Sequence, residues 1–286
     1  MKVLVTGYGG QLGYDVVKKL WELDIESKGV DVADFDLTNR EEVQRYIRKY
    51  NPDVVVHCAA YTAVDKAEDE KELCYAVNVR GTEYIAEVCK ELGAKMVYIS
   101  TDYVFNGEGE EPFEVDSPVG AKNQYGLTKY QGELEVQKYL DKYFIVRVSW
   151  VFGINGNNFI KTMLRLGKEK EELNVIDDQV GSPTYTHDLA KLIVEMIQTD
   201  KYGIYHASNE GYCSWYEFAR EIFRQAGYPT KVNPITTDEY PTKAARPHNS
   251  RMEKKNLGMN GFNRLPRWED ALKEYLNAIG VLKSGE

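Results

Sequence analysis

Short apolar runs alternate with amphipathic stretches through the first half of the chain. The runs are rich in Val, Ile and aromatic residues, which is typical of strands buried on both faces, and they occupy residues 2–6, 54–58, 96–100 and 144–149. Between them, apolar residues recur three and four positions apart, and this spacing predicts helices at 12–23, 39–49, 72–92 and 125–139. Because strands and helices alternate, we expect an α/β fold with a doubly wound parallel sheet.

The alternation weakens after residue 152. The pattern there predicts helices at 159–168, 187–198 and 268–279 and short strands at 174–177 and 203–208. A further helix is predicted at 214–226 with Ser214 as its N-cap, because Glu217 stands three residues later, as in a capping box. Three prolines predict an irregular loop over 233–250.

Composition excludes several classes of protein. Of the 286 residues 43% are hydrophobic, which is enough to build a core, and the net charge of −9 argues against a nucleic-acid partner. The longest apolar run, 54–60, is far shorter than the ~20 residues of a membrane-spanning helix. The first strand begins at residue 2 and leaves no room for a signal peptide. The cysteines form no CxxC pair. We therefore expect a cytoplasmic protein without nucleic-acid or membrane partners.

A glycine-rich turn follows the first strand and opens the first helix. Gly7, Gly10 and Gly13 have the GxxGxxG spacing of a dinucleotide fingerprint, in which a pyrophosphate approaches the helix N-terminus. Asp31 lies 18 positions after Gly13, where a carboxylate can accept hydrogen bonds from the adenosine ribose; a solvated turn residue is the alternative. Small residues at 58–62 close what we expect to be the fourth strand and allow a cofactor to approach the backbone.

These features predict two domains. A dinucleotide-binding domain of the Rossmann type spans 1–152, with a returning contribution from about 174–208. A smaller, mostly C-terminal α/β substrate-binding domain comprises 153–173 and 209–286.

A phenol and an ammonium group lie four residues apart at Tyr125 and Lys129, so a helix places both on one face. A free phenol has a pKa near 10, and we expect the Lys129 charge to favour the phenolate of Tyr125. With 21 tyrosines in the chain, such a pair can also arise by chance. Thr101 directly follows the strand at 96–100, where its hydroxyl can polarise a carbonyl oxygen beside Tyr125. The alternative is a capped strand end, which explains Ser100 but explains the whole Ser-Thr-Asp run at 100–102 less well.

The order of the motifs points to a known family. They are TGYGGQLG (6–13), HCAAYTAVDKAE (57–68), STDYVFNG (100–107), YGLTK (125–129), RVSWVFG (147–153), GNNFIKTML (156–164), DDQVGSPTY (177–185) and YPTKAARPHNSR (240–251). On these motifs the chain resembles the extended short-chain dehydrogenase/reductase superfamily and, within it, the dTDP-4-dehydrorhamnose reductase family, although ARPHNS replaces the family's SRPxNS. The resemblance implies reduction of dTDP-4-dehydro-6-deoxy-L-mannose to dTDP-L-rhamnose, with NADH or NADPH as the cofactor.

The resemblance also implies roles for individual residues. Tyr125 would donate the proton, Thr101 would be its hydroxyl partner, and Lys129 would also hold the nicotinamide ribose. Thr101, Asp102 and Trp150 match substrate contacts. The residues that match cofactor contacts are Gly10, Gln11, Leu12, Asp31, Asp36, Leu37, Ala60, Tyr61, Thr62, Tyr125 and Lys129.

Two further features concern the substrate and the assembly. Arg246 lies in the segment that resembles the family's substrate loop, and we expect it to pair with the substrate diphosphate; a surface salt bridge is the alternative.

Some family members form dimers through a magnesium ion held by acidic residues. Here Asp15 keeps an acid near the first helix but His187 departs from that pattern. We therefore predict no metal and leave a homodimer open.

Two other functions fit the same motifs. The first is a nucleotide-sugar epimerase or dehydratase, but a dehydratase usually has Asp then Glu after the active-site threonine, whereas Asp102 is followed by Tyr103. The second is a regulatory subunit resembling that of methionine adenosyltransferase, which would bind the cofactor without turnover. Intact Thr101, Tyr125 and Lys129 favour an enzyme.

Overall fold

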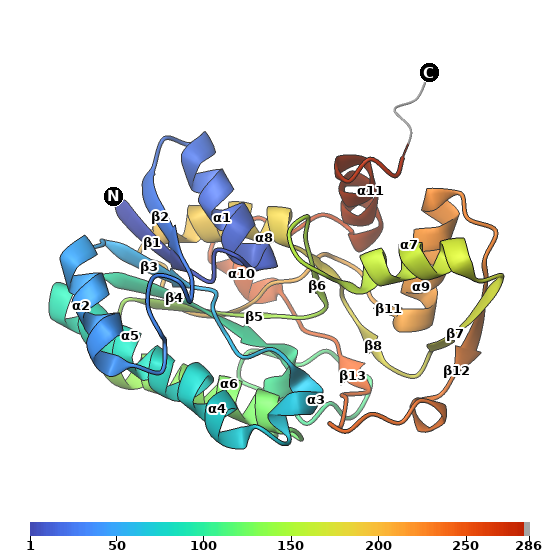
Figure 1. The fold of residues 1–286 in the computed structure, drawn as a ribbon, viewed down its shortest axis with the longest axis horizontal. Helices are drawn as coiled ribbons and strands as arrows, with labels where there is room; N and C mark the ends of the chain where they lie inside the picture. Colours follow the sequence, from blue (N-terminus) through green and yellow to red (C-terminus); the bar gives the residue numbers. More distant parts are fainter. Residues whose placement is uncertain (283–286) are drawn as a thin grey trace.

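Six parallel strands form the central sheet of the computed structural model, which describes residues 1–282 (Figure 1). They are β1 (Lys2–Thr6), β2 (Glu26–Val30), β3 (Val54–His57), β4 (Lys95–Thr101), β5 (Tyr143–Val148) and β10 (Gly203–His206). Their order across the sheet is β10-β5-β4-β3-β1-β2, so β2 lies on one side of β1 and the other four strands lie on the opposite side. Ligands bind at the carboxyl ends of the strands beside such a switch point. The predicted fold class is confirmed.

Helices cover both faces of this sheet (Figure 1). On one face lie α1 (Gln11–Glu22) and α8 (Thr186–Ile197), and on the other lie α2 (Arg40–Tyr50), α5 (Gly81–Leu92) and α6 (Gln124–Tyr139). Strand β1 shows why the apolar runs are continuous. Val3 and Val5 join the core under α1 and α8, whereas Leu4 joins the core under α2 and α5, and all three are fully buried. Within residues 1–282, no helix combines the length and apolarity that crossing a bilayer requires.

The connections between the strands differ from the prediction in two places. The helix predicted at 72–92 is a run of α4 (Lys71–Tyr75), a π-helix η1 (Ala76–Arg80) and α5, and the short α3 (Val64–Ala67) precedes it. Such π-helical turns are frequent at functional sites. In the described chain no strand lies between β2 and β3, so the strand before residues 58–62 is the third and not the predicted fourth.

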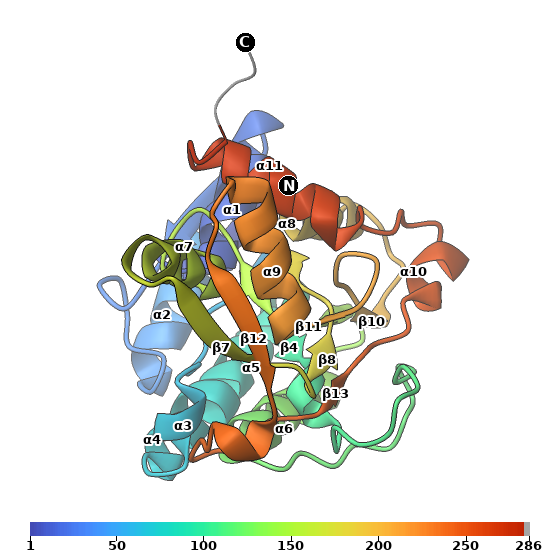
Figure 2. The same ribbon diagram turned by 90° about the vertical axis from the view of Figure 1, so that its right-hand side faces the viewer.

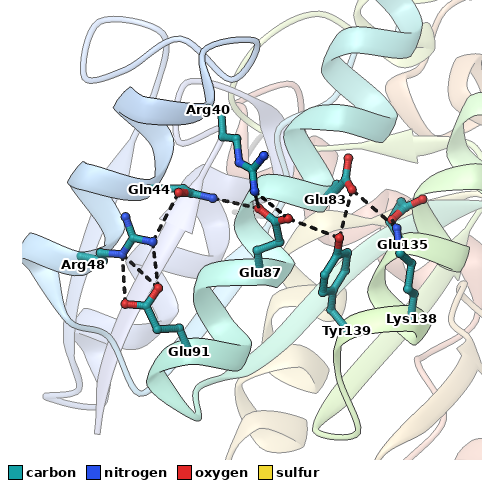
Figure 3. Close-up of polar contacts among 9 residues, drawn as sticks. All are labelled: Arg40, Gln44, Arg48, Glu83, Glu87, Glu91, Glu135, Lys138 and Tyr139. Atoms are coloured by element: carbon teal, nitrogen blue, oxygen red, sulfur yellow. Dashed lines mark hydrogen bonds and ion pairs between the residues drawn. The ribbon is translucent and has the colours of Figure 1, made fainter.

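A polar network ties α2, α5 and α6 together (Figure 3). Both carboxylate oxygens of Glu87 in α5 accept hydrogen bonds from Arg40 in α2, at 2.9 and 2.8 Å. Glu87 also accepts one from the Tyr139 hydroxyl in α6 at 3.2 Å. Farther along the same pair of helices, Arg48 donates to Glu91. A single exposed ion pair contributes only ~0–1 kcal/mol, but contacts that converge on one carboxylate fix how α2 and α6 lie against α5.

A second, smaller core lies beside the sheet. It is built from α7 (Phe159–Glu169), α9 (Trp215–Ala226) and α11 (Trp268–Ala278). Beside α9, β7 (Glu172–Ile176) and β12 (Lys231–Ile235) form a two-stranded parallel sheet (Figure 2). The remaining elements are β6 (Val151–Phe152), β8 (Val180–Gly181), β9 (Thr184–Tyr185), β11 (Cys213–Ser214), β13 (Asn249–Ser250), α10 (Lys255–Met259) and two 3-10 turns, η2 (Asp102–Val104) and η3 (Thr237–Glu239).

The second half of the chain confirms one local prediction and corrects another. The capping box is present, since the Ser214 hydroxyl accepts from the Glu217 N–H at 3.0 Å and the Glu217 carboxylate accepts from the Ser214 N–H at 2.8 Å. The irregular loop predicted for 233–250 is wrong in part, because Pro234 lies within β12. A strand tolerates a proline where it pairs on one side only, and β12 has β7 as its single partner.

The chain between residues 172 and 206 passes from the smaller lobe to the large sheet, and the point of passage helps to locate the domain boundary. Strand β7 pairs with β12 in the smaller lobe, whereas side chains of α8 and β10 belong to the core of the large sheet. We propose the division that the sequence predicts: a dinucleotide-binding domain of 1–152 with a returning contribution from about 174–208, and a substrate-binding domain of 153–173 and 209–286. The pairing of β7 with β12 favours a start of the returning contribution at α8.

Candidate active site

A cleft of about 780 Å³ lies at the carboxyl ends of β1, β3, β4 and β5. Nearly all the predicted site residues line it. They are Gly7, Gly10, Gln11, Leu12, Gly13, Asp31, Asp36, Leu37, Ala60, Tyr61, Thr62, Thr101, Asp102, Tyr125, Lys129 and Trp150. The predicted residue that is not part of the lining is Arg246. The cleft therefore lies at the switch point of the sheet and contains both the glycine turn and the Tyr-Lys pair.

The glycine turn leaves a cradle of backbone N–H groups at the start of α1. Gly7 has a φ of +71°, and a Cβ atom there would lie 2.7 Å from the backbone nitrogen of Ala59. A Cβ atom at Gly13 would collide with the carbonyl oxygen of Gly7. No side chain caps α1, whose N-cap residue is Gly10. A helix N-terminus with free N–H groups and no Cβ atoms in front of it fits a pyrophosphate.

Asp31 holds this turn in place. One of its carboxylate oxygens accepts the Gly9 N–H at 2.7 Å, and the other accepts the Val32 N–H at 2.8 Å. Because Asp31 also lines the cleft at the end of β2, its remaining lone pairs face the position where an adenosine ribose would lie. Its contact with the ribose remains a prediction.

The smaller lobe contacts the glycine turn through residues that the sequence analysis did not single out. The Asn155 side chain donates to the carbonyl of Gly9 at 2.8 Å. The side-chain oxygen of Gln11 accepts from the Gly153 N–H at 2.8 Å and from the Asn158 amide at 3.1 Å. These pairs are more than 140 positions apart, and no local pattern signals them. They fix the smaller lobe against the cofactor side of the cleft.

Tyr125 lies half-buried in the first turn of α6, in the wall of the cleft. The helix begins at Asn123, whose side-chain oxygen accepts the Gly126 N–H at 2.8 Å. Burial and the nearby Asp102 carboxylate raise the pKa of Tyr125, and the Thr101 hydroxyl opposes this only in part. The expectation that Lys129 would favour the phenolate is therefore wrong for this structure: burial dominates, and the phenol keeps its proton at neutral pH.

Lys129 lies one turn further along α6 with only 3% of its surface exposed. Its ammonium nitrogen lies 4.0 Å from the centroid of the Tyr98 ring. Burial lowers the pKa of Lys129 to about 7, although the Glu133 carboxylate favours the charged form. The positive charge of this group therefore depends on pH near neutrality.

We expect kcat/KM for the cofactor to fall as the pH rises through about 7. The pKa of Lys129 is lowered, so the proton is lost above that value and with it the charge that would hold the ribose. A Lys129→Arg variant provides the control, because its guanidinium keeps its charge throughout the range. A wild-type profile that stays flat between about pH 6 and 9 would contradict the expected titration.

Asp102 lines the cleft with a carboxylate that is almost completely buried. It is 4% exposed, and its Oδ1 accepts a hydrogen bond from the Thr101 hydroxyl at 2.9 Å. Its Oδ2 is buried and has no hydrogen-bond partner among the described residues. Burial raises the pKa of this carboxyl to about 6. Buried polar atoms without partners are rare, so Asp102 is suited to accept a hydrogen bond from a ligand hydroxyl.

Trp150 lies in an unusual backbone conformation at the junction of the lobes. Its φ is +48°, in the left-handed region that a bulky residue seldom adopts. Its ring stacks on that of Trp215 with centroids 3.7 Å apart, and Gly181 leaves room for it on β8. Trp215 also lines the cleft, and the sequence analysis did not identify it. The two stacked rings form an aromatic part of the cleft wall.

A buried ion pair lies beside Lys129, between α6 and β5. Arg147 in β5 donates to both carboxylate oxygens of Glu133 in α6, at 2.9 and 2.7 Å, and the two residues are 3% and 1% exposed. The Ser100 hydroxyl donates to the same carboxylate at 2.5 Å. Glu133 stands four residues after Lys129 and eight after Tyr125. The pair therefore fixes the catalytic face of α6 against β4 and β5.

Arg246 and Asp15, which lies in α1, are not among the residues that line the cleft. The Arg246 guanidinium donates to Asp65 at 2.7 Å, which is the salt bridge of the alternative interpretation, and its contact with substrate remains a prediction. Asp15 accepts a hydrogen bond from the Thr186 hydroxyl. Within residues 1–282, no group of three or more His, Cys, Asp or Glu side chains is placed to hold a metal ion.

The whole chain matches a known family. The family described as the RmlD substrate binding domain matches residues 1–281. The chain belongs to this family. It is 42% identical over 276 residues to the spore coat polysaccharide biosynthesis protein SpsK of Bacillus subtilis (strain 168), with 96% of each chain covered. It is 40% identical over 293 residues to the dTDP-4-dehydrorhamnose reductase of Escherichia coli (strain K12), with 98% of each covered.

A solved structure agrees with these matches. The dTDP-4-dehydrorhamnose reductase of Bacillus anthracis str. Ames, in complex with NADP, is 44% identical to this chain and superposes with a TM-score of 0.95. The match covers 97% of this chain and 100% of the other. The family resemblance predicted from the motifs is confirmed.

Proposed function

We propose that this chain reduces the 4-keto group of dTDP-4-dehydrorhamnose to give dTDP-L-rhamnose, a nucleotide sugar for cell-surface polysaccharides, with NADH or NADPH as cofactor. The observation that carries the proposal is the placement of Tyr125, Lys129 and Thr101 in one cleft with the glycine cradle of α1. Relatives named dTDP-4-dehydrorhamnose reductase, aligned over nearly the whole chain, support the choice of substrate.

The residues present fit a nicotinamide dinucleotide. Gly7, Gly10 and Gly13 leave the space that a pyrophosphate needs, and Asp31 faces the ribose position. Lys129 would hold the nicotinamide ribose beside Tyr125. The bound cofactor supplies a hydride to the sugar carbon.

Tyr125 provides the proton for the carbonyl oxygen. Because burial keeps the phenol protonated, it can donate a hydrogen bond to that oxygen and then transfer its proton as negative charge develops there. The Thr101 hydroxyl lies within hydrogen-bonding reach of Tyr125, and it would donate a second hydrogen bond to the same oxygen by turning its single proton away from Asp102. Asp102 and Trp150 also line the cleft, where they would contact the sugar.

The test is the loss of nicotinamide absorbance with a dTDP-4-keto-6-deoxy sugar, compared with the UDP- and GDP-linked analogues. Oxidation of the cofactor with the dTDP sugar supports the proposal. Tight NADH binding without turnover of any keto sugar would instead favour a regulatory subunit. An epimerase would convert the sugar without net loss of reduced cofactor.

The open question of a homodimer is addressed by light scattering of the same preparation.

We expect Asp31→Ala to improve the use of NADPH relative to NADH. A carboxylate that accepts hydrogen bonds from the ribose hydroxyls repels a 2′-phosphate, so its removal relieves the repulsion. Because Asp31 also holds Gly9, Asp31→Asn is the matched variant that keeps an acceptor for this N–H but removes the charge. Ratios of kcat/KM for the two cofactors provide the measurement. An unchanged ratio in both variants would show that another residue sets the preference.

A further inference from the structure

The segment between β12 and β13 runs from the smaller lobe to the catalytic helix. Figures 1 and 2 both show it passing close to α3. Its beginning is tied to the smaller lobe, where the Thr237 N–H donates to both carboxylate oxygens of Asp178 at 3.0 Å. The part that reaches the large lobe, residues 242–247, is called the strap below. The strap therefore joins the two lobes outside the residues that line the cleft.

Two side chains of the large lobe hold the strap. One carboxylate oxygen of Asp65 accepts the Ala244 N–H at 3.0 Å, and the other accepts the Arg246 guanidinium at 2.7 Å. The Asn123 amide donates to the carbonyl of Ala245 at 2.8 Å. Asn123 is also the N-cap of α6, two positions before Tyr125. The strap is thus fixed directly to the start of the helix that carries the proposed proton donor.

These contacts leave one side of the Arg246 guanidinium unpaired. Nη2 is bound by Asp65, whereas Nη1 is buried and has no hydrogen-bond partner among the described residues. Burial raises the pKa of Tyr103 and the charge of Arg246 opposes this, so the guanidinium lies near a phenol that lines the cleft. A buried, charged donor without a partner is costly unless an anion completes its hydrogen bonds.

We propose that Asp65 is a positioning residue for substrate binding, which holds the strap against α3 and keeps the Arg246 guanidinium beside Tyr103 in the cleft wall, where its unpaired side would pair with the diphosphate of the nucleotide sugar. This inference rests on the proposed function. Asp65 itself does not line the cleft, so it acts through Arg246 and not by contact with the substrate.

The experiment compares Asp65→Ala and Asp65→Asn with the wild type in the reduction of the dTDP keto sugar. We expect KM for the sugar to rise about ten-fold or more, as loss of a charge-assisted hydrogen bond implies. We expect kcat and KM for the cofactor to change less than about two-fold, because Tyr125 and Lys129 are untouched. Asparagine keeps the size of the side chain and an acceptor for Ala244, so it isolates the loss of the pair with Arg246.

A double-variant cycle shows whether Asp65 acts through Arg246. Arg246→Ala should raise KM for the sugar by itself, and Asp65→Asn added to it should cause no further rise. Asp69→Ala is the matched control, since it removes only the exposed ion pair with Lys243 in the same strap. Additive effects in the double variant, or equal effects of Asp69→Ala and Asp65→Asn, would overturn the proposal.

Binding of dTDP alone to the cofactor-bound protein, measured by calorimetry, separates this inference from the proposed function. Weaker dTDP binding in the Asp65 variants supports the positioning role even if the wild-type protein reduces no keto sugar. Unchanged dTDP binding together with unchanged KM would refute the positioning role while leaving the reductase assignment intact.

Discussion

Replacing Tyr125 with phenylalanine is expected to lower kcat by roughly 10²–10⁴-fold, the usual contribution of a positioned acid. The substitution keeps the ring in the wall of the cleft and removes only the hydroxyl. Since the pKa of Tyr125 is raised by burial, the wild-type phenol is the protonated donor at neutral pH. The measurement is the single-turnover rate of cofactor oxidation with the dTDP keto sugar.

Cofactor binding provides the control for this variant. Lys129 is unchanged, so the dissociation constant for NADH or NADPH should stay near that of the wild type. Lys129→Met should instead weaken cofactor binding and slow turnover, because it removes the charge that would hold the ribose. Wild-type turnover by the Tyr125→Phe protein would remove Tyr125 from the proposed mechanism.

The sequence predicts most of the large lobe because its pattern is local and repeated. Each apolar run ends at the same edge of a parallel sheet, so residues placed just after the runs, such as Thr101 and 58–62, are expected to meet there. The Tyr125–Lys129 pair follows from helical spacing alone. For these residues the prediction needed only the type of each element and the direction of each strand.

The residues that were missed depend on contacts between distant parts of the chain. Trp215 opens α9 and looks like an ordinary helical residue until Trp150 stacks on it across the lobes. Asn155 lies in the β6–α7 connection and bonds to Gly9, 146 positions earlier in the chain. The sequence predicts a loop at Pro234, because periodicity does not reveal that its strand pairs on one side only in a small sheet.

The spacing of residues also does not predict how burial shifts the pKa values of Tyr125 and Lys129. From spacing, Lys129 is a charge beside a phenol, and the phenol was expected to become more acidic. In the structure Lys129 is buried and Tyr125 is half-buried, and their removal from water raises the pKa of Tyr125 and lowers that of Lys129. The direction of each shift is set by how completely the two lobes and α6 exclude water, which no spacing of residues encodes.

Replacing Glu133 with glutamine is expected to destabilise the protein by about 3–5 kcal/mol, the usual cost of breaking a buried ion pair from one side. Arg147 is 3% exposed, and the substitution leaves its guanidinium buried opposite a neutral amide. Urea unfolding followed by far-UV circular dichroism measures the change. A midpoint that falls at an unchanged m-value would assign the loss to stability and not to a more expanded native state.

The double variant Glu133→Leu/Arg147→Met separates the cost of an unpaired charge from the cost of lost packing. It removes both charges and keeps apolar volume, so it should be more stable than Glu133→Gln. Glu133 also favours the charged form of Lys129. Its loss should therefore move the fall in kcat/KM for the cofactor to lower pH, because Lys129 then gives up its proton more easily. If stability falls while this pH profile stays in place, the Glu133–Arg147 pair supports the fold beneath the site without tuning the lysine.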